Sequence, residues 1–294
     1  MDHQTVVTAN RAALDATLKF GARRLGAAKW EPAPRSEAAR ELASSEICAN
    51  GDPWGERSPR TAYAAANLMM HAVLDDLGTI RQLLGDQMPV IGPTVVARSA
   101  IEISSGAWWI MEPGIGVHSR VCRELVASLA SARRAGQVAG ELQAAGGPAS
   151  AAIADAFQQE AHVLQRITDL AIAAPTSGFS PKIENEKADD ATHATAAMLK
   201  AVLPAGAAGT TIYRTYSAVT HGEIYGLMNF MVPGVTSDGS TLLHWHLPPD
   251  VLDSTIQLAI GAFSESLKRI NKVMGWDRIE VDLWEMKIRK IYAG

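Results

Sequence analysis

Apolar residues recur at spacings of three and four along most of the chain, and breaks rich in proline and glycine separate these runs. Such spacing is typical of amphipathic α-helices, because side chains three or four positions apart lie on one helix face. Thr61 and Thr94 stand where helix N-caps are expected. The pattern predicts helices over residues 5–28, 36–45, 61–84, 94–112, 119–145, 150–173, 189–203, 210–231, 249–274 and 277–292.

The segment VTSDGSTLLHWHLP, residues 235–248, has turn residues followed by a short alternation of apolar and polar positions. This pattern predicts a β-hairpin or an extended loop. With short connections elsewhere, the expected fold is an all-α bundle of about eight to ten helices. We expect a single domain over residues 1–294, and the break near 175–188 is the best candidate for a boundary between subdomains.

Composition narrows the class of protein. Of the 294 residues, 47% are apolar and 20% are charged, which is typical of soluble globular proteins. The net charge of −4 argues against a protein that coats nucleic acid or an anionic membrane, although a local basic cleft stays compatible with it. Cys48 and Cys122 have neither metal-type spacing nor a disulfide pattern, so we expect reduced thiols in a cytoplasmic protein. The polar N-terminus and the lack of a long apolar run predict neither a secretory signal nor a membrane span.

The most informative stretch is YRTYSAVTHG, residues 213–222. In a helix, Arg214, Ser217 and His221 would fall at positions i, i+3 and i+7 on one face. A permanent cation, a hydroxyl and an imidazole that titrates near neutrality are unusual on an otherwise apolar helix. That face either lines a polar site or forms a structural hydrogen-bond network. Arg214 and His221 are the candidate catalytic residues. A Ser217–His221 nucleophilic pair is a weaker alternative, because a serine on a helix surface lacks the strained presentation that hydrolases use.

A second helix offers a partner. Arg98, Glu102 and Trp109 lie close to one stripe of the segment ARSAIEISSGAWWIMEP. Glu102 is expected to pair with Arg98 on its own helix or with Arg214 across the bundle. An ion pair of the first kind would orient helices, whereas the second would make Glu102 a third catalytic residue that positions Arg214 or His221. Both interpretations stay open at this point.

Three segments carry a family resemblance. They are LMMHAVLDDLGTIRQLLG, the Arg98–Glu102 helix with WWIMEP and SRVCREL, and YRTYSAVTHGEIYGL. These segments make up less than a third of the chain. Through them the chain resembles a family of helical proteins from high-GC actinobacteria. This resemblance implies an architecture more than an activity.

The Arg214 helix also resembles the motif helix of the HEPN superfamily, in which a histidine follows an arginine after a spacer of about four to six residues. The spacer here is TYSAVT. In HEPN nucleases the arginine holds the scissile phosphate, and the histidine handles proton transfer from the ribose 2′-OH without metal. The resemblance implies these roles for Arg214 and His221, with RNA as the partner and no cofactor, and hence a metal-independent ribonuclease or a toxin-type effector. Thr215 follows the arginine where active members usually place Asn, Asp or His.

Aromatic residues and methionines cluster on the same two helices. They are expected either to pack the core or to line an apolar pocket in which Arg214, His221 and Glu102 are the polar anchors. The second case predicts a small-molecule-binding protein, or a cofactor-free enzyme acting on an apolar metabolite. The residues expected to bind substrate are Arg98, Trp109, Tyr213, Ser217 and Tyr225.

Metal binding is the third class considered. His71 with Asp75, and Asp189 with His193, are spaced i, i+4, which resembles di-iron oxidases of the haem-oxygenase-like type. The paired Glu-x-x-His motifs of ferritin-like sites are absent, so we expect no metal. His244 and His246 are expected to be surface or hydrogen-bonded residues.

Geometry should separate the first two classes. A nuclease needs Arg214 and His221 to open onto a groove wide enough for RNA, which we expect at the seam of a homodimer. A metabolite site would bury the same residues in a closed cavity.

Overall fold

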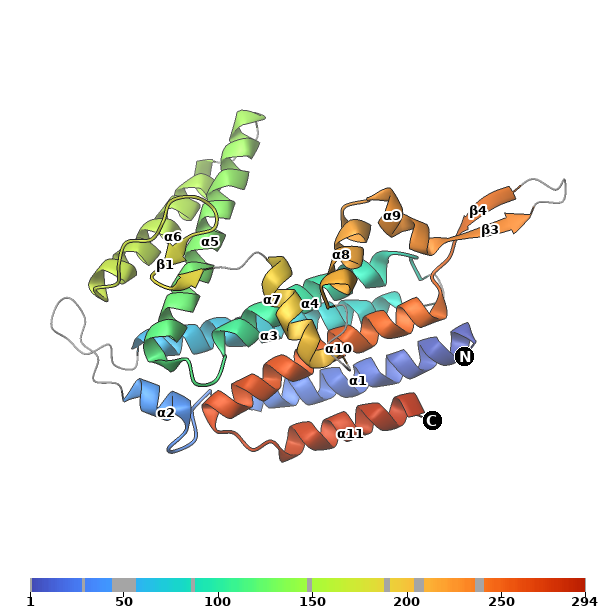
Figure 1. The fold of residues 1–294 in the computed structure, drawn as a ribbon, viewed down its shortest axis with the longest axis horizontal. Helices are drawn as coiled ribbons and strands as arrows, with labels where there is room; N and C mark the ends of the chain where they lie inside the picture. The colour runs from blue at the N-terminus through green and yellow to red at the C-terminus, as the bar shows by residue number, and fades with distance from the viewer. Residues whose placement is uncertain are drawn as a thin grey trace.

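The computed structural model describes residues 2–27, 30–43, 57–85, 88–146, 150–187, 191–203, 209–235 and 241–293. These residues are overwhelmingly helical, and two small two-stranded sheets accompany the helices (Figure 1). The prediction of an all-α multi-helix bundle with a short hairpin is confirmed. The helices are α1 His3–Ala27, α2 Glu37–Leu42, α3 Arg57–Leu83, α4 Gly92–Ile110, α5 Gly116–Ala144, α6 Ser150–Asp169, α7 Ala191–Val202, α8 Gly209–Thr220, α9 Ile224–Leu227, α10 Pro249–Met274 and α11 Ile279–Ala293.

The main bundle consists of α1, α3, α4, α10 and α11, which lie side by side (Figure 1). Helix α10 packs on both α1 and α4, and its apolar residues recur at helical spacing. Trp284 of α11 closes one side of the core, because its ring stacks on Phe20 and meets the edge of Phe263. Burial of these apolar faces is the main contribution to the stability of the bundle.

Helices α5 and α6 project away from the bundle and enclose a second, smaller core (Figure 1). A two-residue strand on each side of a tight turn, β1 Lys182–Ile183 and β2 Glu186–Lys187, packs on α5. Ile183 of this hairpin is fully buried in the second core. Residues 182–187, within the candidate boundary near 175–188, therefore form a small hairpin that covers the second core.

A buried network joins α2 to the start of α5. The guanidinium of Arg120 is inaccessible to solvent and donates hydrogen bonds to Glu41, to Glu37 and to the carbonyl of Ile110. The hydroxyl of Tyr63 donates to Glu41 at 2.5 Å. Burial, followed by the negative charge of Glu41, raises the pKa of Tyr63. These groups compensate one another's charges where water cannot.

Both predicted threonine caps are wrong. Helix α3 begins at Arg57, and the hydroxyl of Thr61 donates back to the Arg57 carbonyl inside the first turn. Helix α4 begins at Gly92 with Pro93 in its first turn, where a missing N–H has no cost.

The predicted helix 210–231 is also wrong, since α8 ends at Thr220. Gly222 adopts a left-handed conformation with φ of 69°, and the amides of Gly222 and Glu223 donate to the carbonyls of Val219 and Ala218. This is a Schellman ending, which makes His221 the last residue before the chain turns. The chain then folds back so closely that a Cβ on Gly226 would lie 2.7 Å from the Cβ of Ala218.

After α9 and one turn of 3₁₀ helix at Met228–Phe230, the strands β3 Met231–Val235 and β4 Thr241–Trp245 form an antiparallel hairpin (Figure 1). The hairpin starts at Met231, earlier than the predicted 235, because the helical run stops earlier. In the described part of the chain, no helix combines the length and the apolar character that a bilayer crossing requires.

Candidate functional site

Helix α8 separates two hollows of different chemistry. Thr211, Thr215 and Val219 project from one face toward α10, whereas Arg214 and Ser217 project from the opposite face. An angular step of about 100° per residue explains this division, because positions 211, 215 and 219 form one stripe and 210, 214 and 217 another.

The Arg214 pocket is a hollow of about 350 Å³ between α7, α8 and the start of α9. Among the residues that the structure describes, the guanidinium of Arg214 is exposed and has no hydrogen-bond or ion-pair partner. The Tyr225 hydroxyl donates to the backbone carbonyl of Arg214 at 3.4 Å, and so holds one wall of the pocket. The lining consists of His193, Ala196, Thr210, Tyr213, Arg214, Ser217, Ala218, Glu223 and Tyr225.

His221 is exposed and lies just beyond the end of α8, where its amide donates to the carbonyl of Ser217 at 2.9 Å. It is not among the residues that line the Arg214 pocket. The imidazole in that lining belongs to His193 of α7. Sequence reasoning had considered His193 only as a metal ligand, because nothing in the local pattern indicates that α7 lies beside α8.

Glu102 pairs with Arg98, which is one of the two alternatives left open by the sequence. Glu102 Oε1 accepts from Arg98 Nε at 2.8 Å and from the Tyr213 hydroxyl at 2.7 Å. The Arg98 guanidinium also lies over the Tyr213 ring, 5.6 Å from its centroid. Burial, followed by the hydrogen bond to Glu102, raises the pKa of Tyr213. This trio fixes α8 on α4, and Tyr213 connects it to the Arg214 pocket.

Trp109 lies elsewhere. The guanidinium of Arg123 sits 5.1 Å from its ring centroid and donates to its carbonyl at 2.6 Å. Trp108 is covered by Arg269 in the same way. Neither tryptophan is among the lining residues of the hollows on α8, so the structure does not bring Trp109 to the other candidate substrate-binding residues.

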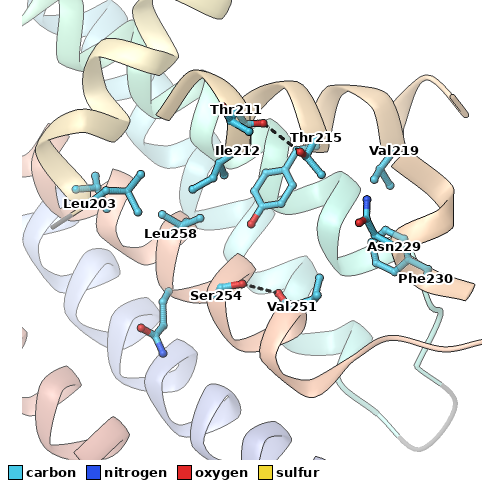
Figure 2. A pocket seen from close by; sticks show the side chains of 13 residues that line it. Leu203, Thr211, Ile212, Thr215, Val219, Asn229, Phe230, Val251, Ser254 and Leu258 are labelled. Atoms are coloured by element: carbon cyan, nitrogen blue, oxygen red, sulfur yellow. Dashed lines mark hydrogen bonds between the residues drawn. The ribbon is translucent and has the colours of Figure 1, made fainter. Parts of the chain in front are cut away.

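The second hollow, which we call the apolar cavity, has a volume of about 430 Å³ and lies between α8 and α10 (Figure 2). Leu203, Ile212 and Leu258 form its apolar side, and Asn229 and Phe230 close one end (Figure 2). The hydroxyls of Thr215 and Ser254 are engaged with backbone carbonyls of their own helices. Arg214, His221 and Glu102 do not line this cavity.

The histidine–carboxylate pairs weighed as metal ligands do not form a group of three in the described part of the chain. His71 and Asp75 are exposed on α3, His193 lies on α7, and Asp189 falls outside the described residues. The described part of the chain contains a different group of three ligand-type side chains, on α5 and the β1–β2 turn. His244 is exposed on β4, and the ring of His246 lies 6.4 Å from that of His3.

Large apolar side chains are exposed on α9, which borders the Arg214 pocket, and on the β3–β4 hairpin. Among them, Ile224 is 79% exposed. Exposed apolar patches of this kind commonly mark interaction sites. The exposed residues are Ile224, Tyr225 and Met228 on α9 and the turn that follows it, Val232 on one face of the hairpin, and Leu243 and Trp245 on its other face.

Comparison with protein-family models, with curated proteins and with solved structures gives no match. The function of the chain must therefore be inferred from its own residues.

Proposed function

We propose that the protein is a HEPN-like, metal-independent ribonuclease whose phosphate-binding residue is Arg214. The observation that supports this best is the state of the Arg214 guanidinium, which is exposed, has no partner among the described residues and borders a polar hollow. Other arginines in the described part of the chain, such as Arg98 and Arg120, are bonded to carboxylates. A cation without a partner is ready to bind an external anion, and the planar fork of arginine suits a phosphodiester.

The groups around Arg214 suit transesterification by the ribose. The 2′-oxygen would attack phosphorus while a general base takes its proton, and the 5′-oxygen would leave with a proton from a general acid. The products are a 2′,3′-cyclic phosphate and a 5′-hydroxyl. We assign these proton transfers to His193 of α7, which lines the pocket, and to His221 at the end of α8. Glu223 is a further carboxylate in the pocket lining.

Exposure also favours a groove over a closed metabolite site. Arg214, His221 and Tyr225 are all exposed, as RNA binding at an open surface requires. Ile224, Tyr225 and Met228 of α9 and the turn that follows it form an exposed apolar surface, and Tyr225 itself lines the Arg214 pocket. We propose that a second copy of the chain covers this surface, so that the groove forms at the dimer seam.

The test is cleavage of single-stranded RNA in excess EDTA. We expect product with a 2′,3′-cyclic phosphate, abolished in Arg214→Ala and poorly restored in Arg214→Lys, since lysine lacks the fork geometry. The variants His193→Ala and His221→Ala measure separately how much each imidazole contributes to cleavage. Arg134→Ala is the control, because Arg134 is also an exposed helical arginine, on α5.

Binding gives an independent measurement. Removing one phosphate contact to a single strand should change the slope of log affinity against log salt by about 0.7. Arg214→Ala should show this change, and Arg134→Ala should not. Cleavage that needs a metal ion, or that survives in Arg214→Ala, would overturn the proposal.

The apolar cavity supports a second candidate function, the binding of an apolar small molecule. Its volume of about 430 Å³ is in the range of ligand pockets, and its lining combines apolar side chains with the amides of Asn229 and Gln257. Binding there should be insensitive to salt, because apolar burial is not screened. A bulky Thr215→Trp should block it, and Arg214→Ala should leave it unchanged.

A further inference from the structure

A cluster of ligand-type side chains lies on the part of the molecule that the proposed function does not use. His118 and Cys122 are one turn apart on α5, and Glu184 occupies the β1–β2 turn. One ligand atom from each residue lies within 4.8 Å of the others. The spacing of i, i+4 places the imidazole and the thiol on the same helix face. A third donor from a distant segment meets them there.

Glu184 is held over α5 from both sides. Its neighbour Ile183 is fully buried in the second core, and the carboxylate of Glu186 accepts from Arg123 Nε at 2.9 Å. Glu184 itself has φ of 52°, in the left-handed region that residues other than glycine seldom adopt. This conformation is the one that the first residue of a two-residue hairpin loop adopts, so the turn itself fixes the position of Glu184.

We propose that His118, Cys122 and Glu184 form a binding site for a zinc-class divalent metal ion. Thiolate and imidazole ligands favour zinc and related transition metals over magnesium and calcium, which prefer oxygen. The charges balance, because one divalent cation offsets a thiolate and a carboxylate while the imidazole stays neutral. Metal binding would therefore release the thiol proton to solvent.

The geometry leaves one coordination position open. Cys122 is fully buried, whereas the side chains of His118 and Glu184 are 42% and 32% exposed. Water can therefore complete a tetrahedral set from the solvent side, as in zinc sites with three protein ligands. His118 Nε2 and Glu184 Oε2 now share a hydrogen bond at 2.5 Å. Tetrahedral zinc would separate these atoms to about 3.3 Å, which a rotation of the partly exposed Glu184 side chain supplies.

The experiment is a titration of the untagged, full-length protein with Co²⁺ after treatment with EDTA and its removal. We expect one ion per chain and a thiolate-to-cobalt charge-transfer band in the near ultraviolet, which Zn²⁺ displaces. Cys122→Ser should lose the band. The matched control is Cys48→Ser, which removes the other cysteine of the chain and should keep it.

Cys122 is buried, so its variant can fail to fold, and two surface variants keep the proposal testable. His118→Asn and Glu184→Gln should each weaken Co²⁺ binding by more than about tenfold, since even outer-shell partners of metal ligands contribute that much. Absence of the band from the wild-type protein would overturn the proposal. So would a band that persists in Cys122→Ser, or unchanged affinity in both surface variants. None of these residues lines the Arg214 pocket, so the outcome is independent of the ribonuclease test.

Discussion

Replacing Arg120 by methionine should destabilise the protein far more than replacing any surface arginine. The Arg120 side chain is 0% exposed, and its guanidinium lies 2.8 Å from a carboxylate oxygen of Glu41. Methionine fills similar space but leaves Glu41, which is 5% exposed, without a counter-charge. Breaking a buried pair in this way typically costs about 3–5 kcal/mol. At about 2 °C for each kcal/mol in a chain of this size, the melting temperature should fall by roughly 6–10 °C.

The assay is urea unfolding followed by circular dichroism, with thermal melting as a second measurement. Arg120→Met combined with Glu41→Leu should recover part of the loss, because the buried charge of Glu41 is then gone while the Tyr63 hydroxyl loses its acceptor. Arg214→Ala should change the free energy of unfolding by less than about 0.5 kcal/mol, as expected for a surface position. A loss below about 1 kcal/mol in Arg120→Met, or a double variant no more stable than the single one, would refute the reasoning.

Two further predictions concern the fold around the network and the site. Because burial and then Glu41 raise the pKa of Tyr63, its hydroxyl stays protonated in the folded protein while the unfolded chain ionises above about pH 10. The contribution of Tyr63 to the free energy of unfolding should therefore be constant below that pH and decrease above it. In Tyr63→Phe the fall should be shallower by about 1.4 kcal/mol for each pH unit. Equal slopes for the two proteins in alkaline urea titrations would contradict this. Gly226→Ala should lower the unfolding free energy by about 1–3 kcal/mol, because the new Cβ would lie 2.7 Å from that of Ala218. The control is Gly140→Ala, in open space on α5, which should raise the unfolding free energy by about 0.5–1 kcal/mol. An unchanged stability of Gly226→Ala would show that α9 can shift to accommodate the new Cβ.

Helical periodicity was enough to predict the fold class, because each amphipathic run must bury its apolar stripe whatever it packs against. The same reasoning failed at the end of α8. The run from Thr210 to Met231 reads as one helix, but Gly222 offers a left-handed ending, and packing of Gly226 against Ala218 stabilises the reversal. Helix propensity takes no account of that contact, because the contact depends on which residues are neighbours in space.

For the candidate site, too, local spacing predicted some features and tertiary packing decided others. Local spacing was enough to make Arg98 one of two candidate partners for Glu102, and to place Arg214 and Ser217 on one face of another helix, but only the structure chose Arg98 over Arg214. It could not reveal that His193 comes from α7 to line the Arg214 pocket. Nor could it show that Trp109 lies under Arg123, on a different part of the molecule.

The cluster of His118, Cys122 and Glu184 shows most clearly how far sequence patterns can predict a site. The sequence by itself contained the i, i+4 spacing of His118 and Cys122, which is a property of neighbouring positions. Tertiary structure alone decided that Glu184 would join them, because burial of Ile183 and the Glu186–Arg123 ion pair carry a distant turn onto that face. Short-range patterns follow from the geometry of one helix. Contacts between remote segments depend on the packing of the whole chain, and no local pattern encodes it.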